Sequence, residues 1–285
     1  MKVLILGGSG LLGRALTCVF AASHTVHCPS HAELDVAQPS QVRAAVEREA
    51  PDLVVHSAAL ADVDRCEQDP EAAWRVNALG AQAVAQACGE RDCPLVFISS
   101  DYVFDGHQQL PYTEFDETRA VNVYGRTKIA AEAAVRTFCR KHYIVRTTWL
   151  FAPWGKNYVT QTLASLRQGE TTPAVADQYA SPSAAFDVAQ GIARLVTAPD
   201  YGTYHLVNRG LCSRFEMAQA ICRAAGLDEA LVKPIASDSV RRPAPRPRFT
   251  ALRNYRLELQ GGDFMRPFAE ALAECVNQIG PAPAG

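Results

Sequence analysis

The stretch VLILGGSGLLG, residues 3–13, decides the fold of this 285-residue chain. It opens with four consecutive apolar residues, as in a strand that is buried on both faces of a parallel sheet. Gly7, Gly10 and Gly13 come next, and an apolar helical pattern continues after them. Strand, glycine-rich turn and helix in this order are the fingerprint of a dinucleotide-binding fold, since the glycines allow a tight turn and the helix amino end meets the pyrophosphate. The alternative is a glycine-rich turn that binds no ligand. The position of the glycines directly after the first strand disfavours this alternative.

Strand patterns alternate with helical patterns beyond this stretch. We expect further strands at residues 25–28, 34–36, 53–56, 95–98 and 143–145, and helices at 39–49 and from residue 69 past residue 84. This alternation predicts an α/β fold of the Rossmann type with a doubly wound parallel sheet. The dinucleotide-binding domain is expected at residues 1–149, and residues 184–198 are expected to pack back onto its sheet.

The strict alternation weakens in the second half of the chain. Residues 150–285 are expected to form a smaller mixed α/β lobe that binds the substrate, with elements near residues 157–167, 203–206, 213–225, 231–235 and 264–276. A cleft between the two lobes is the expected substrate site.

Composition narrows the range of functions. A formal net charge of −2 leaves no basic surface for nucleic acid. The nine cysteines are scattered, odd in number and without a Cys-x-x-Cys pair, which favours reduced thiols over a disulfide framework or a zinc site. The first apolar run is too short for a signal segment, and no run approaches a membrane-spanning length. We expect a cytoplasmic protein that uses no metal and binds neither membrane nor nucleic acid.

A tyrosine and a lysine four residues apart stand in the stretch VNVYGRTK, residues 121–128, which reads as the first turns of a helix. Positions i and i+4 share one helical face, so the Tyr124 phenol and the Lys128 ammonium point into the same space. A nearby cation lowers the pKa of a phenol from its usual value of about 10, which suits acid–base work. Chance would give one such pair in about six chains of this composition. The pair predicts a proton-delivery device once the dinucleotide fingerprint is counted with it.

Small and polar residues follow two of the expected strands at their carboxyl ends, where open α/β sheets bind ligands. Ser57, Ala58 and Ala59 follow the strand at 53–56 and let a cofactor lie close. Ser100 follows the strand at 95–98, where its hydroxyl can hydrogen-bond a substrate carbonyl oxygen, although a serine there can equally cap a helix or turn. Asn77, inside a helical pattern, is ambiguous in the same way.

Taken together, these motifs resemble the extended short-chain dehydrogenase/reductase family. Within it, the chain is most similar to the dTDP-4-dehydrorhamnose reductase family. The segments that carry this resemblance are SDYVFDG (100–106), NVYGRTK (122–128), VRTTWLF (145–151), GKNY (155–158), Asp177-Gln178 and Arg246-Pro247. The resemblance covers nearly the whole chain and stops at the Pro/Ala/Gly tail after residue 280.

The resemblance implies a role for each matching position. Tyr124 would be the general acid, Lys128 would lower its pKa and hold the nicotinamide ribose, and Ser100 would bind the reacting carbonyl. The cofactor would contact Gly7, Gly10, Leu11, Leu12, Gly13, Asp35, Val36, Ser57, Ala58, Ala59, Asn77, Tyr124 and Lys128. The nucleotide-sugar substrate would face Asp101, Tyr102, Trp149 and Arg246. The implied reaction is the NAD(P)H-dependent reduction of the 4-keto group of a dTDP-6-deoxy-4-keto-hexose. A homodimer is compatible with the sequence, which does not decide the oligomeric state.

The end of the second strand predicts the choice of cofactor. Enzymes of this fold that select NADH usually have Asp or Glu at this position, where the carboxylate accepts from the ribose 2′-hydroxyl of NADH. The same carboxylate repels the 2′-phosphate of NADPH. This chain has Cys28-Pro29-Ser30-His31 at the expected place, and its first acid is Glu33. We therefore expect NADPH to serve at least as well as NADH.

Two other functions fit the same motifs. The regulatory beta subunit of methionine adenosyltransferase also resembles this sequence, and a nucleotide-sugar epimerase would share its fold. The chain also departs from the reductase pattern at Leu60-Ala61, at Ser100, where threonine is usual, and at Ala180. Serine keeps the hydroxyl that the chemistry needs, whereas Ala61 and Ala180 leave the identity of the sugar open.

Overall fold

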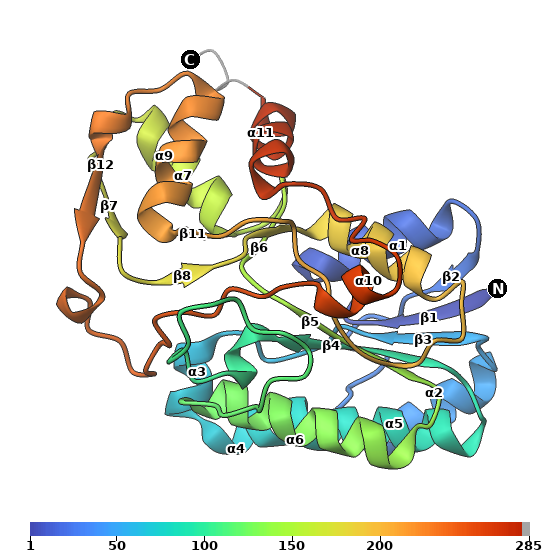
Figure 1. Cartoon of the computed structure of the whole chain (residues 1–285). Helices are drawn as coiled ribbons and strands as arrows, with labels where there is room; N and C mark the ends of the chain where they lie inside the picture. The colour runs from blue at the N-terminus through green and yellow to red at the C-terminus, as the bar shows by residue number, and fades with distance from the viewer. Residues whose placement is uncertain (281–285) are drawn as a thin grey trace.

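The computed structural model describes residues 1–280. A six-stranded, fully parallel sheet in the order β10-β5-β4-β3-β1-β2 forms its centre (Figure 1). The strands are β1 (Lys2–Leu6), β2 (Thr25–His27), β3 (Leu53–His56), β4 (Leu95–Ser100), β5 (His142–Thr147) and β10 (Gly202–His205). The chain adds β2 on one side of β1 and then β3 on the other side, so the strand order reverses at β1, and doubly wound sheets bind their ligands at this switch point.

Helices cover both faces of this sheet. One face packs against α1 (Leu11–Ala21) and α8 (Ala185–Leu195), and the other against α2 (Pro39–Glu49), α5 (Gly80–Glu90) and α6 (Val123–Phe138). The inner strands are apolar on both faces because both faces are covered. In β1, for example, Val3 and Ile5 pack with the first group of helices, while Leu4 and Leu6 pack with the second.

The helix expected from residue 69 is continuous but changes its winding. After the short helices α3 (Val63–Gln68) and α4 (Pro70–Ala73), the chain forms a π-helical segment, Trp74–Leu79, before α5 begins. The Asp69 side chain caps the start of α4 by accepting from Ala72 N at 3.0 Å. Such π segments are uncommon and often occur at functional sites, and this one contains Asn77.

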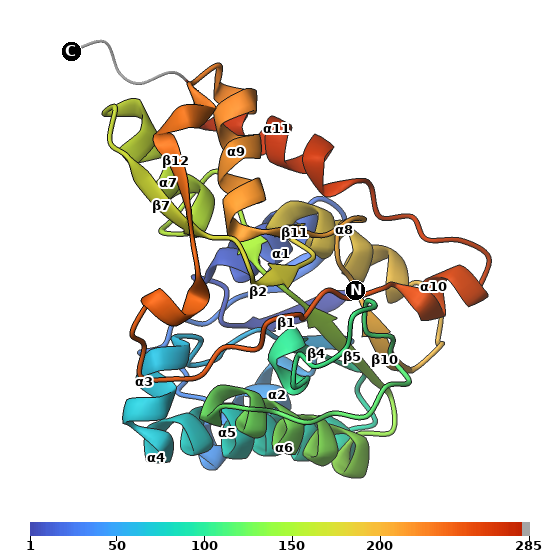
Figure 2. The same cartoon turned by 60° about the vertical axis from the view of Figure 1, so that its left-hand side comes forward.

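The remaining elements form a smaller group above the carboxyl ends of the large sheet (Figure 2). Its core lies between α7 (Tyr158–Arg167), α9 (Arg214–Ala225) and α11 (Phe268–Ile279). Three two-stranded ladders accompany these helices, namely β12 (Val232–Ile235) with β7 (Thr172–Val175), β11 (Cys212–Ser213) with β8 (Tyr179–Ala180), and β6 (Leu150–Phe151) with β9 (Ser183–Ala184). The short helix α10 (Tyr255–Leu259) contacts β10. Within residues 1–280, no helix is both long and apolar enough to cross a membrane.

Two predicted elements were wrong. Residues 34–36 form no strand, because the Asp35 side chain accepts from Ala37 N at 2.9 Å and turns the chain toward α2. Leu34 and Val36 are nevertheless buried against α2 and α5, so their apolar character reflects burial in a loop. Residues 203–206 were expected in the smaller lobe, but 202–205 form β10, the edge strand of the large sheet beside β5. The helix α8 supplies the crossover that returns the chain to that edge.

Candidate functional site

A cleft of about 500 Å³ opens above the carboxyl ends of β1, β3 and β4. The large sheet supplies one wall through residues 10–13, 98–102 and the start of α6, and the segment 147–158 supplies another. A single residue of α9, Arg214, completes the lining. The cleft thus lies where the fold brings the sequence motifs together.

The turn between β1 and α1 is open toward this cleft. Gly7 has φ +86°, a backbone conformation that L side chains rarely adopt. A side chain at Gly13 would place its Cβ 2.0 Å from the carbonyl oxygen of Gly7, so the turn can close only with glycine there. The first turn of α1 has no side-chain cap and no acidic residue, and Gly10, Leu11, Leu12 and Gly13 line the cleft. Free amides at a helix start fit the pyrophosphate of a dinucleotide.

The loop after β3 lies against this turn and is held by Asn77. The Asn77 side chain accepts from Leu60 N at 2.8 Å, donates to Leu60 O at 3.1 Å and donates to Thr127 Oγ1 at 3.2 Å. Ser57 Oγ donates to Leu6 O at 2.9 Å. Asn77 therefore joins the β3 loop to α6, and it lies behind the cleft wall.

Ser100 ends β4 and begins a single 3₁₀ turn, η2 (Asp101–Val103). Its hydroxyl accepts from Tyr102 N at 3.2 Å and donates to Asp101 Oδ1 at 2.9 Å. Asp101 is 3% exposed, and burial raises its pKa, while the hydroxyls of Thr250, Thr148 and Ser100 oppose the rise. The serine therefore caps a turn and also lines the cleft, and its contact with a substrate carbonyl stays a prediction.

Tyr124 is the second residue of α6 and lies near Ser100, because α6 packs closely against η2. Asn122 caps this helix by accepting from Gly125 N at 2.9 Å. A Cβ at Gly125 would lie 2.0 Å from Tyr102 O, so glycine lets α6 approach η2. The rings of Tyr102 and Tyr124 meet edge to face with centroids 5.9 Å apart. The close approach brings the phenol to the serine.

The protonation of Tyr124 differs from our expectation. Burial raises the pKa of the Tyr124 phenol far above its usual value, and the neighbouring Ser100 hydroxyl only partly opposes the rise. Lys128 was expected to lower this pKa, but its Nζ donates to Ile98 O at 2.6 Å and lies 4.4 Å from the centre of the Phe97 ring. In this structure the phenol therefore keeps its proton, which is the form that a general acid requires.

Lys128 is 3% exposed on the same helical face as Tyr124. Burial lowers its pKa to about 8, and the negative charge of Glu132 opposes this shift. Glu132 is itself buried, and its two oxygens accept from Arg146 Nε at 2.8 Å and from Arg146 Nη2 at 2.7 Å. Although burial acts to raise the pKa of Glu132, Arg146 keeps it below the usual value. The ion pair between Arg146 and Glu132 thus fixes the turn of α6 that follows Lys128.

The structure brings most of the predicted site residues into one cleft. Its lining includes Gly10, Leu11, Leu12, Gly13, Ser57, Ala59, Ser100, Asp101, Tyr102, Tyr124, Lys128 and Trp149. Five predicted cofactor positions lie outside the lining, namely Gly7, Asp35, Val36, Ala58 and Asn77. Gly7 and Ala58 belong to its supporting wall, since a Cβ on Gly7 would meet Ala58 N at 2.5 Å.

Arg246 stands apart from the cleft. Its Nη2 pairs with Asp64 at 2.9 Å, its Nη1 donates to Ala244 O at 2.9 Å, and it lines a neighbouring hollow with Arg242 and Arg248. The cleft instead contains Arg214, which sequence reasoning missed. No local motif marks Arg214, because it enters the cleft from a helix of the smaller lobe.

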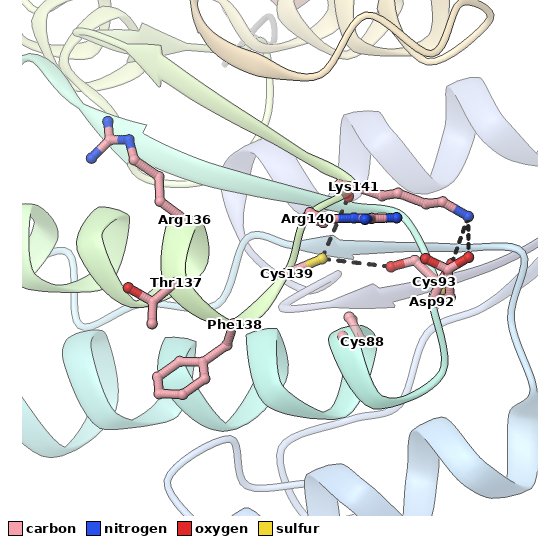
Figure 3. A pocket seen from close by; sticks show the side chains of 10 residues that line it. Cys88, Asp92, Cys93, Arg136, Thr137, Phe138, Cys139, Arg140 and Lys141 are labelled. Atoms are coloured by element: carbon pink, nitrogen blue, oxygen red, sulfur yellow. Dashed lines mark hydrogen bonds and ion pairs between the residues drawn. The ribbon is translucent and has the colours of Figure 1, made fainter.

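Another hollow, of about 340 Å³, lies at the opposite end of the strands (Figure 3). Cys88, Cys93 and Cys139 line it, and Cys139 Sγ donates to the carbonyl oxygens of Cys93 and Lys141 at 3.7 and 3.4 Å. It lies beside the amino ends of β4 and β5, away from the glycine turn and the Tyr–Lys pair. Residues 1–280 contain no group of three His, Cys, Asp or Glu side chains placed to hold a metal ion.

Known proteins match the chain along almost its whole length. Residues 1–280 match the family model described as the RmlD substrate binding domain. A dTDP-4-dehydrorhamnose reductase from Mycolicibacterium smegmatis is 36% identical over 282 residues, which cover 98% of this chain and 86% of that protein. Two solved dTDP-4-dehydrorhamnose reductases have TM-scores of 0.93 and each cover 97% of this chain and 99% of their own. One is from Clostridium acetobutylicum at 35% identity, and the other is from Bacillus anthracis, in complex with NADP, at 33% identity. The chain therefore belongs to the dTDP-4-dehydrorhamnose reductase family.

Proposed function

We propose that this protein is an NADPH-dependent reductase that converts the 4-keto group of a dTDP-6-deoxy-4-keto-hexose to a hydroxyl group. The observation that carries this proposal is the placement of Ser100, Tyr124 and Lys128 in one cleft with the glycine turn of residues 7–13. Carbonyl reduction by a nicotinamide needs a dinucleotide site, a donor for the carbonyl oxygen and a proton, and this cleft contains residues suited to each.

NADPH supplies the hydride when it is bound. The amides at the start of α1 would bind its pyrophosphate. The small residues Ser57 and Ala59 would let the cofactor lie close to the cleft wall. Lys128, at the base of the cleft, would bind the nicotinamide ribose through the ammonium protons that Ile98 O does not take.

Ser100 and Tyr124 would act on the carbonyl oxygen. As negative charge develops there, the Ser100 hydroxyl donates a hydrogen bond and the Tyr124 phenol transfers its proton. In this structure the Ser100 hydroxyl donates its single proton to Asp101 Oδ1 at 2.9 Å, so that proton would turn from Asp101 to the substrate oxygen when the substrate binds. The ammonium of Lys128, one helical turn from the phenol, stabilises the phenolate left after the transfer.

The division of labour between the lobes is part of the proposal. Residues 1–149 with 184–198 would bind the cofactor, and the groups around α7, α9 and α11 would bind the sugar nucleotide. The position of α8 on the large sheet and the separate core of these three helices support this division. A homodimer and a cytoplasmic location stay predictions.

The experiment is a steady-state assay of NADPH oxidation with dTDP-4-keto-6-deoxyglucose and dTDP-4-keto-rhamnose as separate substrates. We expect oxidation of NADPH in proportion to the hydroxy-sugar formed, with the product identified by NMR. An epimerase would change the sugar without net oxidation of NADPH, and a regulatory subunit would bind NADPH without turnover. Either result would refute the proposed reduction.

A further inference from the structure

Arg214 is the first residue of α9 and the residue that this helix contributes to the cleft lining. Its guanidinium carbon lies 3.5 Å from the centre of the Trp149 ring and 4.5 Å from the centre of the Tyr158 ring. Tyr158 also holds the backbone of this residue, because its hydroxyl donates to Arg214 O at 2.9 Å. Two aromatic rings thus fix the guanidinium in the cleft.

This cation has no carboxylate partner among residues 1–280. The side-chain hydrogen bond that it makes within this range runs from Nη1 to the sulfur of Met217, a weak acceptor, at 3.9 Å. Arg146 and Arg246 differ from it, since each pairs with a carboxylate. Burial lowers the pKa of Arg214 from its usual value, which marks the cost of removing this charge from water without a counterion.

The charge of the cleft favours an anion. Its lining carries three basic side chains, Lys128, Lys156 and Arg214, and one acid, Asp101. The Asp101 side chain accepts from the Ser100 hydroxyl, and no ion pair joins it to Arg214 within residues 1–280. Lys128 is bonded to Ile98 O at the base of the cleft. Arg214 is therefore the cation that the smaller lobe holds in a fixed position in the cleft, on the wall contributed by that lobe.

We infer that Arg214 binds the diphosphate of the nucleotide-sugar substrate and so selects for sugars that carry a charged nucleotide. The planar guanidinium offers paired N–H donors that match two phosphate oxygens, while Trp149 and Tyr158 keep it in one orientation. The inference rests on the proposed function, because it assigns a residue to the substrate of that same cleft. It adds a residue that neither the motifs nor Arg246 accounts for.

The experiment compares the binding of dTDP and of uncharged thymidine by isothermal titration calorimetry. The variants are Arg214→Met, which keeps the apolar stem and loses the charge, and Arg214→Lys, which keeps the charge and loses the paired donors. Arg209→Met is the matched control, because Arg209 is exposed and lies outside the cleft lining. We expect Arg214→Met to weaken dTDP binding about 10- to 100-fold and to leave thymidine binding unchanged. Arg214→Lys should lose less, and Arg209→Met should match the wild type.

Each other outcome has a definite meaning. Unchanged dTDP affinity in Arg214→Met would overturn the inference, and so would an equal loss for dTDP and thymidine, since that result indicates a structural role. If Arg214→Met does not fold, a dTDP affinity of Arg214→Lys equal to that of the wild type would overturn it. A wild-type protein that binds NADPH but no dTDP would instead refute the proposed substrate, so the two failures are distinguishable.

Discussion

Tyr124 is partly buried at the wall of the cleft, where its phenol keeps its proton until a substrate oxygen accepts it. Burial raises its pKa, and the nearby Lys128 carries its charge at the base of the same face. A donor that is protonated across the physiological range needs stabilisation of its phenolate only during the reaction. This arrangement leads to two predictions at single residues.

Replacement of Tyr124 by Phe should remove the proton donor and keep the ring that packs on Tyr102. We expect kcat to fall by about 10²- to 10⁴-fold and the Kd for NADPH to change little. Steady-state kinetics and fluorescence titration of NADPH would measure the two quantities. A variant that keeps most of the wild-type kcat would remove Tyr124 from the mechanism.

Replacement of Lys128 by Met should lower kcat and weaken NADPH binding together, because one ammonium would serve the phenol and the ribose. The Lys128 ammonium is charged below its pKa of about 8, so wild-type kcat/KM should decline as the pH rises through that value. A pH profile of kcat/KM from about pH 6 to about pH 9.5 would show this limb. A flat profile, or unchanged NADPH affinity in the variant, would contradict the assigned role.

At the scale of elements, the contact between α6 and η2 sets the distance between acid and serine. Gly125→Ala would bring a Cβ to 2.0 Å from Tyr102 O, and backbone must move to accommodate it. We expect a loss of about 1–3 kcal/mol in the free energy of unfolding and a fall in kcat. Ala133→Gly, at an exposed position of the same helix, is the control, with a cost of about 1 kcal/mol and unchanged kcat. Full activity in Gly125→Ala would show that the contact does not position Tyr124.

The loop after β2 governs the choice between NADPH and NADH. Its first carboxylate, Glu33, accepts from both the backbone amide and the hydroxyl of Ser30 at 2.8 Å. No acid stands at residues 28–31, so we expect kcat/KM for NADPH to equal or modestly exceed that for NADH. The measurement is kcat/KM for each cofactor at one substrate concentration and fixed salt. A tenfold preference for NADH, about 1.4 kcal/mol, would contradict this expectation.

At the scale of the whole molecule, two buried histidines make folding sensitive to acid. Burial lowers the pKa of His56 and of His205 from 6.5 to about 3. Below about pH 6.5 the unfolded chain therefore binds protons that the folded chain does not, so stability is full above this pH and declines as the pH falls toward 3. Each histidine contributes a slope of about 1.4 kcal/mol per pH unit in this window.

His56 tests this slope cleanly, since its ring nitrogens have no hydrogen-bond partner within the described chain. We expect His56→Leu to reduce the slope of the unfolding free energy between about pH 6 and about pH 4 by about 1.4 kcal/mol per pH unit. Urea unfolding at a series of pH values would measure it. Identical slopes in variant and wild type would show that His56 titrates normally in the folded protein.

Local sequence determined the features that depend on neighbouring residues. The strand and glycine turn of residues 3–13, and the spacing of Tyr124 and Lys128 on one helical face, follow from backbone geometry over a few residues. The apolar run also located β4, although the strand continues two residues past the predicted end, through Ser99 and Ser100. The β/α alternation then sufficed to predict the parallel sheet, and similarity to known reductases supports the family.

Tertiary structure decided the features that depend on distant contacts. Residues 34–36 are apolar because they are buried, yet a loop buries them as well as a strand would, and local pattern does not separate the two cases. β10 joins the large sheet because α8 returns the chain to β5, an event that no short window of sequence records. The pKa of Tyr124 follows burial by neighbours from the whole fold and not the charge four residues away. Arg214 enters the cleft, and Arg246 pairs with Asp64, because packing of the two lobes places them there.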